Sequence, residues 1–135
     1  MPLDDGTAIP PTVPARPRVL VVDDEPAVRM VSRLMLEGAG YMVTEVGDAA
    51  SAVDRVAKAE RPFMVILLDV TLPDRSGTEL LAELRYSTPR SRVVLTSGKP
   101  EEDVPDHGAD GYLPKPFTRD QLLAAVRAAT AMTPT

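Results

Sequence analysis

Residues 18–24 have the sequence Arg-Val-Leu-Val-Val-Asp-Asp, a short apolar and mostly β-branched run that stops at two acids. A continuous apolar run of this length is typical of a central strand that is covered on both faces of its sheet. Residues 64–68 form a second such run, Met-Val-Ile-Leu-Leu, and Asp69 follows it directly. The sequence therefore predicts two buried strands, each of which ends in acid.

Helical and strand-like patterns alternate along the rest of the chain. The other expected strands are Tyr41–Val46, Arg92–Thr96 and Gly111–Pro114, and the expected helices begin at Pro26, after Asp48, after Gly77 and at Thr118. The spacing of Thr118 and Gln121 is that of a capping box. This alternation predicts a parallel sheet between helices, and right-handed crossovers leave it open and doubly wound. We predict an α/β, flavodoxin-like (βα)5 fold with a five-stranded parallel sheet in the order 2-1-3-4-5 and helices on both faces.

The segment between Thr96 and Gly108 departs from this pattern. It contains Gly98, Pro100 and Pro105 together with four acids, and this composition works against a regular helix of several turns. We therefore expect the fourth helix to be short or degraded.

Domain boundaries follow from composition. Residues 1–17 hold five prolines without apolar periodicity, so we expect a disordered leader there. Residues 18–131 form the expected domain and residues 132–135 a tail.

Composition excludes several classes of function. The absence of cysteine excludes disulfides, thiolate metal sites and a cysteine nucleophile, and the single histidine, His107, argues against a multi-histidine zinc site or a serine-protease triad. A net charge of −5 repels phosphate backbones, so we expect no direct contact with nucleic acid. No apolar stretch is long enough for a membrane span and no signal peptide is recognisable, so we expect a cytoplasmic protein without membrane contact.

Three acids are expected at one edge of the predicted sheet. Asp23 and Asp24 follow the first strand and Asp69 follows the third, and these strands are neighbours in the predicted order. Like charges so close together are costly without a cation. Magnesium prefers hard oxygen ligands, so the sequence predicts a Mg²⁺ site.

Two further groups reach the same edge. Thr96 ends the fourth strand and Lys115 follows the fifth. A hydroxyl and an ammonium beside a carboxylate-bound cation indicate a site for a phosphoryl group, with Asp69 as the nucleophile that forms an aspartyl phosphate. Ser97 competes with Thr96 as the hydroxyl donor, because strand alternation allows only one of the two to face the site.

Each of these residues also has an ordinary structural interpretation. The Asp23-Asp24 pair could cap the first helix, Thr96 could be a plain strand residue, and Lys115 could be solvated. Tyr112 could fill the core at the end of a strand. The combination with Asp69 favours the metal site over capping for Asp23-Asp24, and the position of Lys115 between two prolines, in a chain with three lysines, favours a functional role for it.

Four motifs together resemble the receiver domain of two-component response regulators. They are Val-Asp-Asp-Glu at 22–25, Leu-Leu-Asp-Val-Thr-Leu-Pro-Asp-Arg-Ser-Gly at 67–77, Leu-Thr-Ser-Gly at 95–98 and Gly-Ala-Asp-Gly-Tyr-Leu-Pro-Lys-Pro-Phe at 108–117. The resemblance covers residues 18 to about 131, and its motifs occur in the order of the family.

The resemblance implies a role for each matching position. Asp69 matches the phosphorylated aspartate and, with Asp24 and the backbone carbonyl of Thr71, a ligand of the metal. Asp23 matches the acid that acts mostly through metal-bound water, and Lys115 matches the lysine that pairs with the phosphoryl oxygens.

The same motifs imply a switch and a loop. Thr96, which the motif favours over Ser97, matches the switch hydroxyl, and Tyr112 matches the switch aromatic. Pro116 matches a proline whose preceding peptide is cis, and residues 73–77 match the loop that leads into the third helix.

The implied function is that of a phosphoacceptor in a phosphorelay, not of an enzyme that turns over an external substrate. A sensor histidine kinase or a histidine phosphotransfer protein would phosphorylate Asp69 with Mg²⁺, for which Mn²⁺ could substitute. Phosphorylation would then switch contacts with an unknown downstream protein. The receiver could stand alone or belong to a hybrid histidine kinase, and the damaged fourth helix favours a monomer or weak dimer.

Two alternatives remain. The first is a phosphorylation-independent adaptor that uses the receiver fold only for docking. The second is a small magnesium-dependent phosphohydrolase, against which residue 71 is threonine where such enzymes need a second acid, and no cap domain is recognisable.

Overall fold

Five parallel strands form one sheet in the order β2-β1-β3-β4-β5, which confirms the predicted topology. The computed structural model describes residues 16–104 and 108–131. The strands are β1 (Arg18–Val22), β2 (Met42–Val46), β3 (Val65–Asp69), β4 (Arg92–Ser97) and β5 (Gly111–Pro114). The helices are α1 (Pro26–Gly38), α2 (Ala49–Lys58), α3 (Gly77–Ser87) and α4 (Arg119–Thr130), with one 3-10 turn, η1 (Glu101–Asp103). The α/β class and the flavodoxin-like strand order are thus as predicted.

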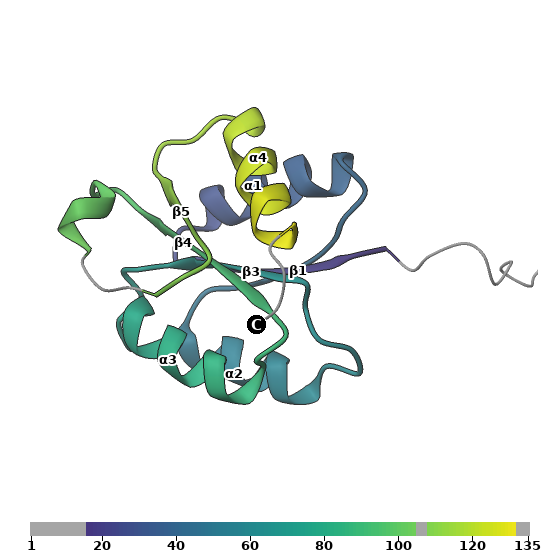
Figure 1. Ribbon diagram of the computed structural model, residues 1–135, viewed down its shortest axis with the longest axis vertical. Helices are drawn as coiled ribbons and strands as arrows, with labels where there is room; N and C mark the ends of the chain where they lie inside the picture. Colours follow the sequence, from purple (N-terminus) through teal and green to yellow (C-terminus); the bar gives the residue numbers. More distant parts are fainter. Residues whose placement is uncertain (1–15, 105–107, 132–135) are drawn as a thin grey trace, which may run out of the picture.

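The sheet lies between two helical layers, with α1 and α4 on one face and α2 and α3 on the other (Figure 1). Alternate residues of each central strand enter different cores, because successive side chains of a strand point to opposite faces. Val19 and Val21 of β1 pack with α4 residues such as Leu122. Leu20 and Val22 belong to the core on the α2 and α3 side. Every residue of β3 is buried, as its continuous apolar sequence predicts.

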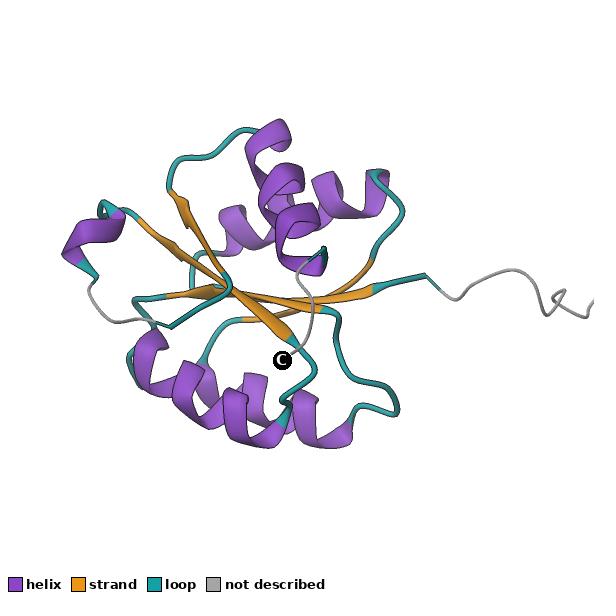
Figure 2. Ribbon diagram, in the orientation of Figure 1, coloured by secondary structure: helices purple, strands orange, loops and turns teal. Residues whose placement is uncertain are grey.

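Side-chain caps fix the starts of three helices. Asp48 accepts a hydrogen bond from the Ser51 N–H at the start of α2. The predicted capping box of Thr118 and Gln121 opens α4, with both reciprocal bonds formed. Ser76 makes an equivalent box at the start of α3. These local signals place the helix starts at the carboxyl ends of the preceding strands (Figure 2).

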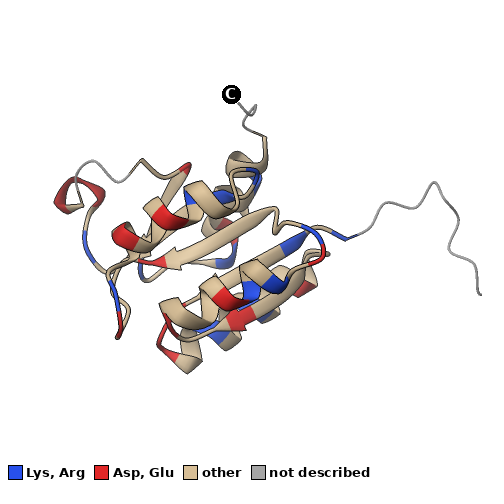
Figure 3. Cartoon of the chain, turned by 90° about the horizontal axis from the view of Figure 1, so that it is seen from below, with Lys and Arg blue, Asp and Glu red and all other residues tan. Residues whose placement is uncertain are grey.

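The fourth helix of the predicted pattern is reduced, as expected. Among the described residues between β4 and β5, the helical part is the single 3-10 turn η1. Its three residues are all acidic, so this turn is red throughout in Figure 3. The helix labelled α4 is therefore the last helix of the alternating pattern.

Several expectations concern residues outside the described part. They are most of the predicted leader (residues 1–15), His107 and the predicted tail (residues 132–135). Within the described residues, no helix combines the length and the apolar character that a bilayer span requires.

A buried hydroxyl in α1 lacks a partner among the described residues. Ser32 is fully buried, and its Oγ has no hydrogen-bond acceptor or donor within reach there. By contrast, the buried Ser91 Oγ lies 2.7 Å from Thr88 Oγ1. The two buried serines can therefore be compared, because the hydroxyl of Ser32 lacks a hydrogen bond there and the hydroxyl of Ser91 has one.

We predict opposite effects of alanine at these two positions. Ser32→Ala removes an unsatisfied polar atom and favours the helix, so the free energy of unfolding should rise by about 1 kcal/mol. Ser91→Ala breaks the bond to Thr88 and should lower it by about the same amount. Urea unfolding of both variants measures the difference, and a loss of stability in Ser32→Ala would contradict the assignment.

Candidate functional site

Strand phase and register bring three predicted residues onto one face of the sheet. Asp69 pairs in register with Thr96 across β3 and β4, and Val22 pairs with Leu68, so Asp23 and Asp69 follow neighbouring strand ends. Asp23, Asp69 and Thr96 continue the alternate positions whose side chains face α1 and α4. All three residues are buried.

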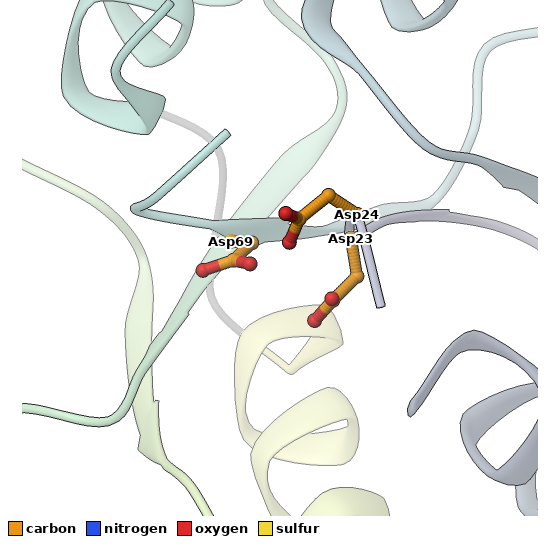
Figure 4. Close-up of side chains that lie close together, drawn as sticks. All are labelled: Asp23, Asp24 and Asp69. Atoms are coloured by element: carbon orange, nitrogen blue, oxygen red, sulfur yellow. The ribbon is translucent and has the colours of Figure 1, made fainter. Parts of the chain in front are cut away.

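The carboxylates of Asp23, Asp24 and Asp69 gather at this edge (Figure 4). One carboxylate oxygen from each lies within 4.8 Å of the others, and Asp24 is the exposed member of the group. The predicted convergence of the three acids is therefore present in the structure. Burial of two like charges side by side is energetically costly.

Lys115 extends into the acidic group from the end of β5. Its Nζ lies 2.7 Å from Asp23 Oδ2 and 3.3 Å from Asp69 Oδ2. Burial lowers the pKa of Lys115, but the hydrogen bond to Asp23 and the charges of Asp69 and Asp23 outweigh it, so the pKa is raised overall. The lysine therefore stays charged at neutral pH. The peptide bond between Lys115 and Pro116 is cis, as the resemblance implies.

The carboxyl group of Asp69 remains costly to ionise despite this ion pair. Burial, and next the charge of Asp23, raise its pKa to about 6. The N–H of Thr71, which donates to Asp69 Oδ1 at 3.0 Å, and the Lys115 ammonium oppose this shift without cancelling it. Asp69 is thus a largely ionised, poorly solvated carboxylate at neutral pH.

The loop after Asp69 is closely held. Gly77 N–H donates to the Val70 carbonyl at 2.7 Å, and a Cβ at Gly77 would overlap the Asp69 carbonyl oxygen, so this position requires glycine. The carboxylate of Asp74 accepts the N–H groups of Ala49 and Ala50 at the start of α2. These two bonds lower the pKa of Asp74. The loop is thereby anchored to both α3 and α2.

The two candidate hydroxyls differ in position. Thr96 shares the face of Asp69, whereas Ser97 Oγ accepts the N–H of Lys99 at 3.0 Å and so caps the turn that follows β4. Tyr112 is partly buried against the core on the α2 and α3 side, and its hydroxyl donates to the Lys99 carbonyl at 2.6 Å. Geometry therefore favours Thr96 over Ser97 as the hydroxyl beside Asp69.

One charged neighbour of the site was not assigned a role by the sequence. Glu25 Oε1 lies 3.2 Å from Lys115 Nζ, and the Glu25 N–H donates to Asp23 Oδ1 at 2.9 Å. The position of Glu25 directly after Asp23 and Asp24 is the sequence signal that could have indicated its place at the site.

The donor set fits a small divalent cation. Asp23, Asp24 and Asp69 provide hard carboxylate oxygens, which suit Mg²⁺ better than soft metals. Oxygens bound to one Mg²⁺ lie about 3–4 Å apart, given bonds near 2 Å, so small rotations would bring the three acids to that spacing. The three acids and Lys115 together carry two negative charges when all are ionised, and Glu25 beside Lys115 adds a third, so one divalent cation would cancel most of this charge.

Comparison with known proteins identifies the family. The family model described as the response regulator receiver domain matches residues 19–127. The chain belongs to this family. Receiver domains are the phosphoacceptor modules of two-component systems.

Related proteins agree with this assignment. The chain is 40% identical over 114 residues to the transcriptional regulatory protein KdpE of Mycobacterium tuberculosis, a match that covers 82% of this chain and 50% of KdpE. The receiver therefore spans about half the length of this relative.

Solved structures show the same fold. The chemotaxis response regulator CheY4 of Vibrio cholerae superposes with a TM-score of 0.78 at 27% identity, covering 85% of this chain and 99% of CheY4. A Burkholderia pseudomallei response regulator, solved with a phosphorylated aspartic acid, a calcium ion and citrate, gives a TM-score of 0.72 at 28% identity. That match covers 82% of this chain and 66% of the other.

We predict a pH-dependent stabilisation of the receiver by Asp69→Asn. Folding raises the pKa of Asp69 from its unfolded value, near 4, to about 6, so ionisation of this group destabilises the fold. Above pH 6 both states are ionised and the full cost is present; between pH 6 and 4 the folded state regains its proton first and the cost fades. The asparagine variant should therefore be more stable than the wild type above pH 6, with a gain that shrinks toward pH 4.

Urea unfolding of the two proteins at several pH values, in the presence of a chelator, tests this. Lys115 retains its partners Asp23 and Glu25 in the variant, so loss of the ion pair with Asp69 does not leave the ammonium without a negatively charged partner. A gain that is constant from pH 4 to 8 would contradict the raised pKa.

Proposed function

We propose that this receiver accepts a phosphoryl group on Asp69, with Mg²⁺ bound by the neighbouring acids. The observation that carries the proposal is the convergence of a buried, poorly solvated Asp69 carboxylate with the Lys115 ammonium and two further acids. A poorly solvated carboxylate is a better nucleophile than a hydrated one, and a fixed ammonium offsets charge on the incoming group.

The reaction is a transfer from nitrogen to oxygen. An oxygen of Asp69 forms a bond to phosphorus while the bond between phosphorus and a histidine nitrogen of the donor breaks, and that nitrogen keeps the electron pair. Asp69 Oδ2 is the oxygen nearest Lys115, whose Nζ would stay close to the transferred group. Bound Mg²⁺ would neutralise charge on the phosphoryl oxygens.

The proposed metal ligands are Asp24, Asp69 and the backbone carbonyl of Thr71, with Asp23 acting mostly through metal-bound water. In this indirect role Asp23 would keep its bonds from the Glu25 N–H and from Lys115. Asp24 is exposed and free to turn toward a cation. We propose Mn²⁺ as a substitute, since it accepts the same oxygen ligands.

We propose Thr96 and Tyr112 as the switch. The Thr96 hydroxyl would turn toward the phosphoryl group on Asp69, the residue of the neighbouring strand with which Thr96 pairs in register. Tyr112 contacts the next turn through Lys99, so a movement of Thr96 would reach the β4–β5 connection. Phosphorylation would then bias a two-state equilibrium of this surface.

A protein donor is supported by an apolar surface beside the site. Met30, Val31 and Leu34 of α1 are exposed at 49%, 42% and 56%. A groove of about 420 Å³ runs from Val31 past Lys115 to Phe117, and so connects this helix face to the phosphoryl site. We propose that a helix of a sensor histidine kinase or histidine phosphotransfer protein packs here, because its histidine must reach Asp69.

The output of the receiver is proposed to be a contact with a downstream protein in the cytoplasm. A net charge of −5 supports a protein target over nucleic acid. The reduced connection around η1 supports a monomer or weak dimer, since little helical surface is available there for pairing.

Phosphorylation should depend on Asp69. We predict that incubation with Mg²⁺ and a small phosphodonor adds one acid-stable, base-labile phosphate, and that Asp69→Asn abolishes the labelling. Intact-mass measurement gives the stoichiometry, and Asp74→Asn, in the same loop, is the control that should still label. Equal labelling of Asp69→Asn would sink the assignment, whereas no labelling of the wild type by any donor would favour the adaptor function.

The α1 surface should matter only for protein donors. Val31→Asp and Leu34→Asp place charge in the proposed contact. The rate of phosphotransfer from the kinase or phosphotransfer protein that phosphorylates the wild type fastest should therefore fall by tenfold or more. Labelling by a small phosphodonor should stay unchanged. Tyr86→Asp is the matched control, because Tyr86 is 91% exposed on α3, on the opposite face of the sheet. Equal losses in all three variants would refute the proposed docking face.

A further inference from the structure

The guanidinium of Arg29 contacts the backbone of the acidic site without touching its carboxylates. Arg29 Nη1 donates to the Asp23 carbonyl oxygen at 2.6 Å. The same guanidinium donates through Nε to Glu45 Oε1 at 3.3 Å. A short bond from a charged donor is among the stronger hydrogen bonds in proteins.

The Asp23 carbonyl is well placed to control Asp24. The peptide unit between these residues is planar, so the direction of its oxygen fixes where the Asp24 N–H and Cα lie. The N–H of Asp23 is already bonded to the Val46 carbonyl at 3.1 Å. With Arg29 on its carbonyl, the turn from β1 into α1 is held on both sides of Asp23, and the exposed Asp24 carboxylate leaves from a fixed point.

Gly47 provides the space that the guanidinium occupies. A Cβ at Gly47 would lie 2.9 Å from Arg29 Nη1 and 3.6 Å from Cζ. That contact is too close for both groups to keep their positions, so a side chain at position 47 forces the Arg29 guanidinium to shift. Glu45, two residues earlier on β2, orients the guanidinium from the other side.

We propose that Arg29 is a positioning residue for the metal site, held between Gly47 and Glu45, which fixes the Asp23–Asp24 peptide so that Asp24 meets the cation. This inference rests on the proposed Mg²⁺ site.

Arg33 offers a close control for the charge of Arg29. It lies one helical turn further along α1 and shares the same carboxylate, with Nε 2.6 Å from Glu45 Oε2, and it also pairs with Glu37. Its bonds go to these two acids and not to the Asp23 carbonyl. Replacement of Arg33 therefore removes a similar charge and a similar salt bridge, but leaves the contact with the metal loop in place.

Electrostatics and positioning predict opposite signs. Removal of a positive charge near three carboxylates strengthens cation binding by Coulomb attraction alone. Loss of the bond to the Asp23 carbonyl weakens it, because Asp24 is no longer prealigned. The direction of the change in Mg²⁺ affinity thus separates the two effects.

The test is isothermal titration calorimetry of the unphosphorylated protein with Mg²⁺, and in parallel with Mn²⁺, which measures the affinity for each cation. We expect Arg29→Met to weaken Mg²⁺ binding by about tenfold, at the lower end of the range for groups that orient metal ligands. Gly47→Ala, which keeps the charge but displaces the guanidinium, should weaken it in the same direction. Arg29→Lys should recover part of the loss, and Arg33→Met should leave the affinity unchanged or slightly higher.

Three outcomes would overturn the inference: unchanged or tighter binding in Arg29→Met, equal losses in Arg29→Met and Arg33→Met, or wild-type affinity in Gly47→Ala. Urea unfolding of each variant shows whether it folds, and Gly47→Ala carries the test if Arg29→Met does not. Asp24→Ala separates a failure of the proposed metal site from a failure of the positioning role of Arg29. If it also binds Mg²⁺ like the wild type, the proposed metal site itself is wrong; if it loses binding while the Arg29 and Gly47 variants do not, only the positioning role fails.

Discussion

The ion pairs of Lys115 with Asp23 and Asp69 hold together two buried carboxylates that would otherwise repel each other. Parallel strand register makes this proximity unavoidable, because β1 and β3 are adjacent and Asp23, directly after β1, shares its face with Asp69 at the end of β3. The ammonium reduces the cost but does not remove it, as the raised pKa of Asp69 shows. The remaining negative charge is what a divalent cation would relieve, whereas burial is what leaves Asp69 poorly solvated. The features that destabilise the site are thus the features that would suit it to the proposed phosphoryl transfer.

Much of this arrangement could be predicted from the strand order. It made the ends of β1 and β3 neighbours and so brought Asp23 and Asp69 together, whereas the face that both side chains share comes from the register in the structure. The same alternation separates Thr96 from Ser97, which instead caps the turn after β4. The reduced fourth helix was also predictable, since proline removes a backbone donor and restricts the residue before it.

The residues that the sequence did not reveal act through long side chains or across long separations. Asp74 bonds the start of α2 from a loop 25 residues further along the chain. Arg29 reaches Glu45 only because β1 and β2 pair in one particular register, and its long side chain extends back from α1 to the Asp23 carbonyl. Local sequence patterns contain no signal for such contacts, because a charged residue such as Asp74 or Arg29 is the ordinary choice at an exposed position. The unsatisfied hydroxyl of Ser32 is equally invisible, because a helical serine usually faces water.

The two loops beside Asp69 are held in different ways, and this difference bears on how a phosphoryl group would act at a distance. The β3–α3 loop is fixed by the close approach of Gly77 and by the bonds of Asp74 to α2. The described part of the β4–β5 connection begins with the hydrogen bonds of Lys99 with Tyr112 and Ser97, contains the single 3-10 turn η1, and is held at its far end by Arg85, which donates to the Gly108 carbonyl. In the proposed switch, a change at Asp69 would therefore reach this connection through β4, whose Thr96 pairs in register with Asp69, and through the contact of Tyr112 with Lys99.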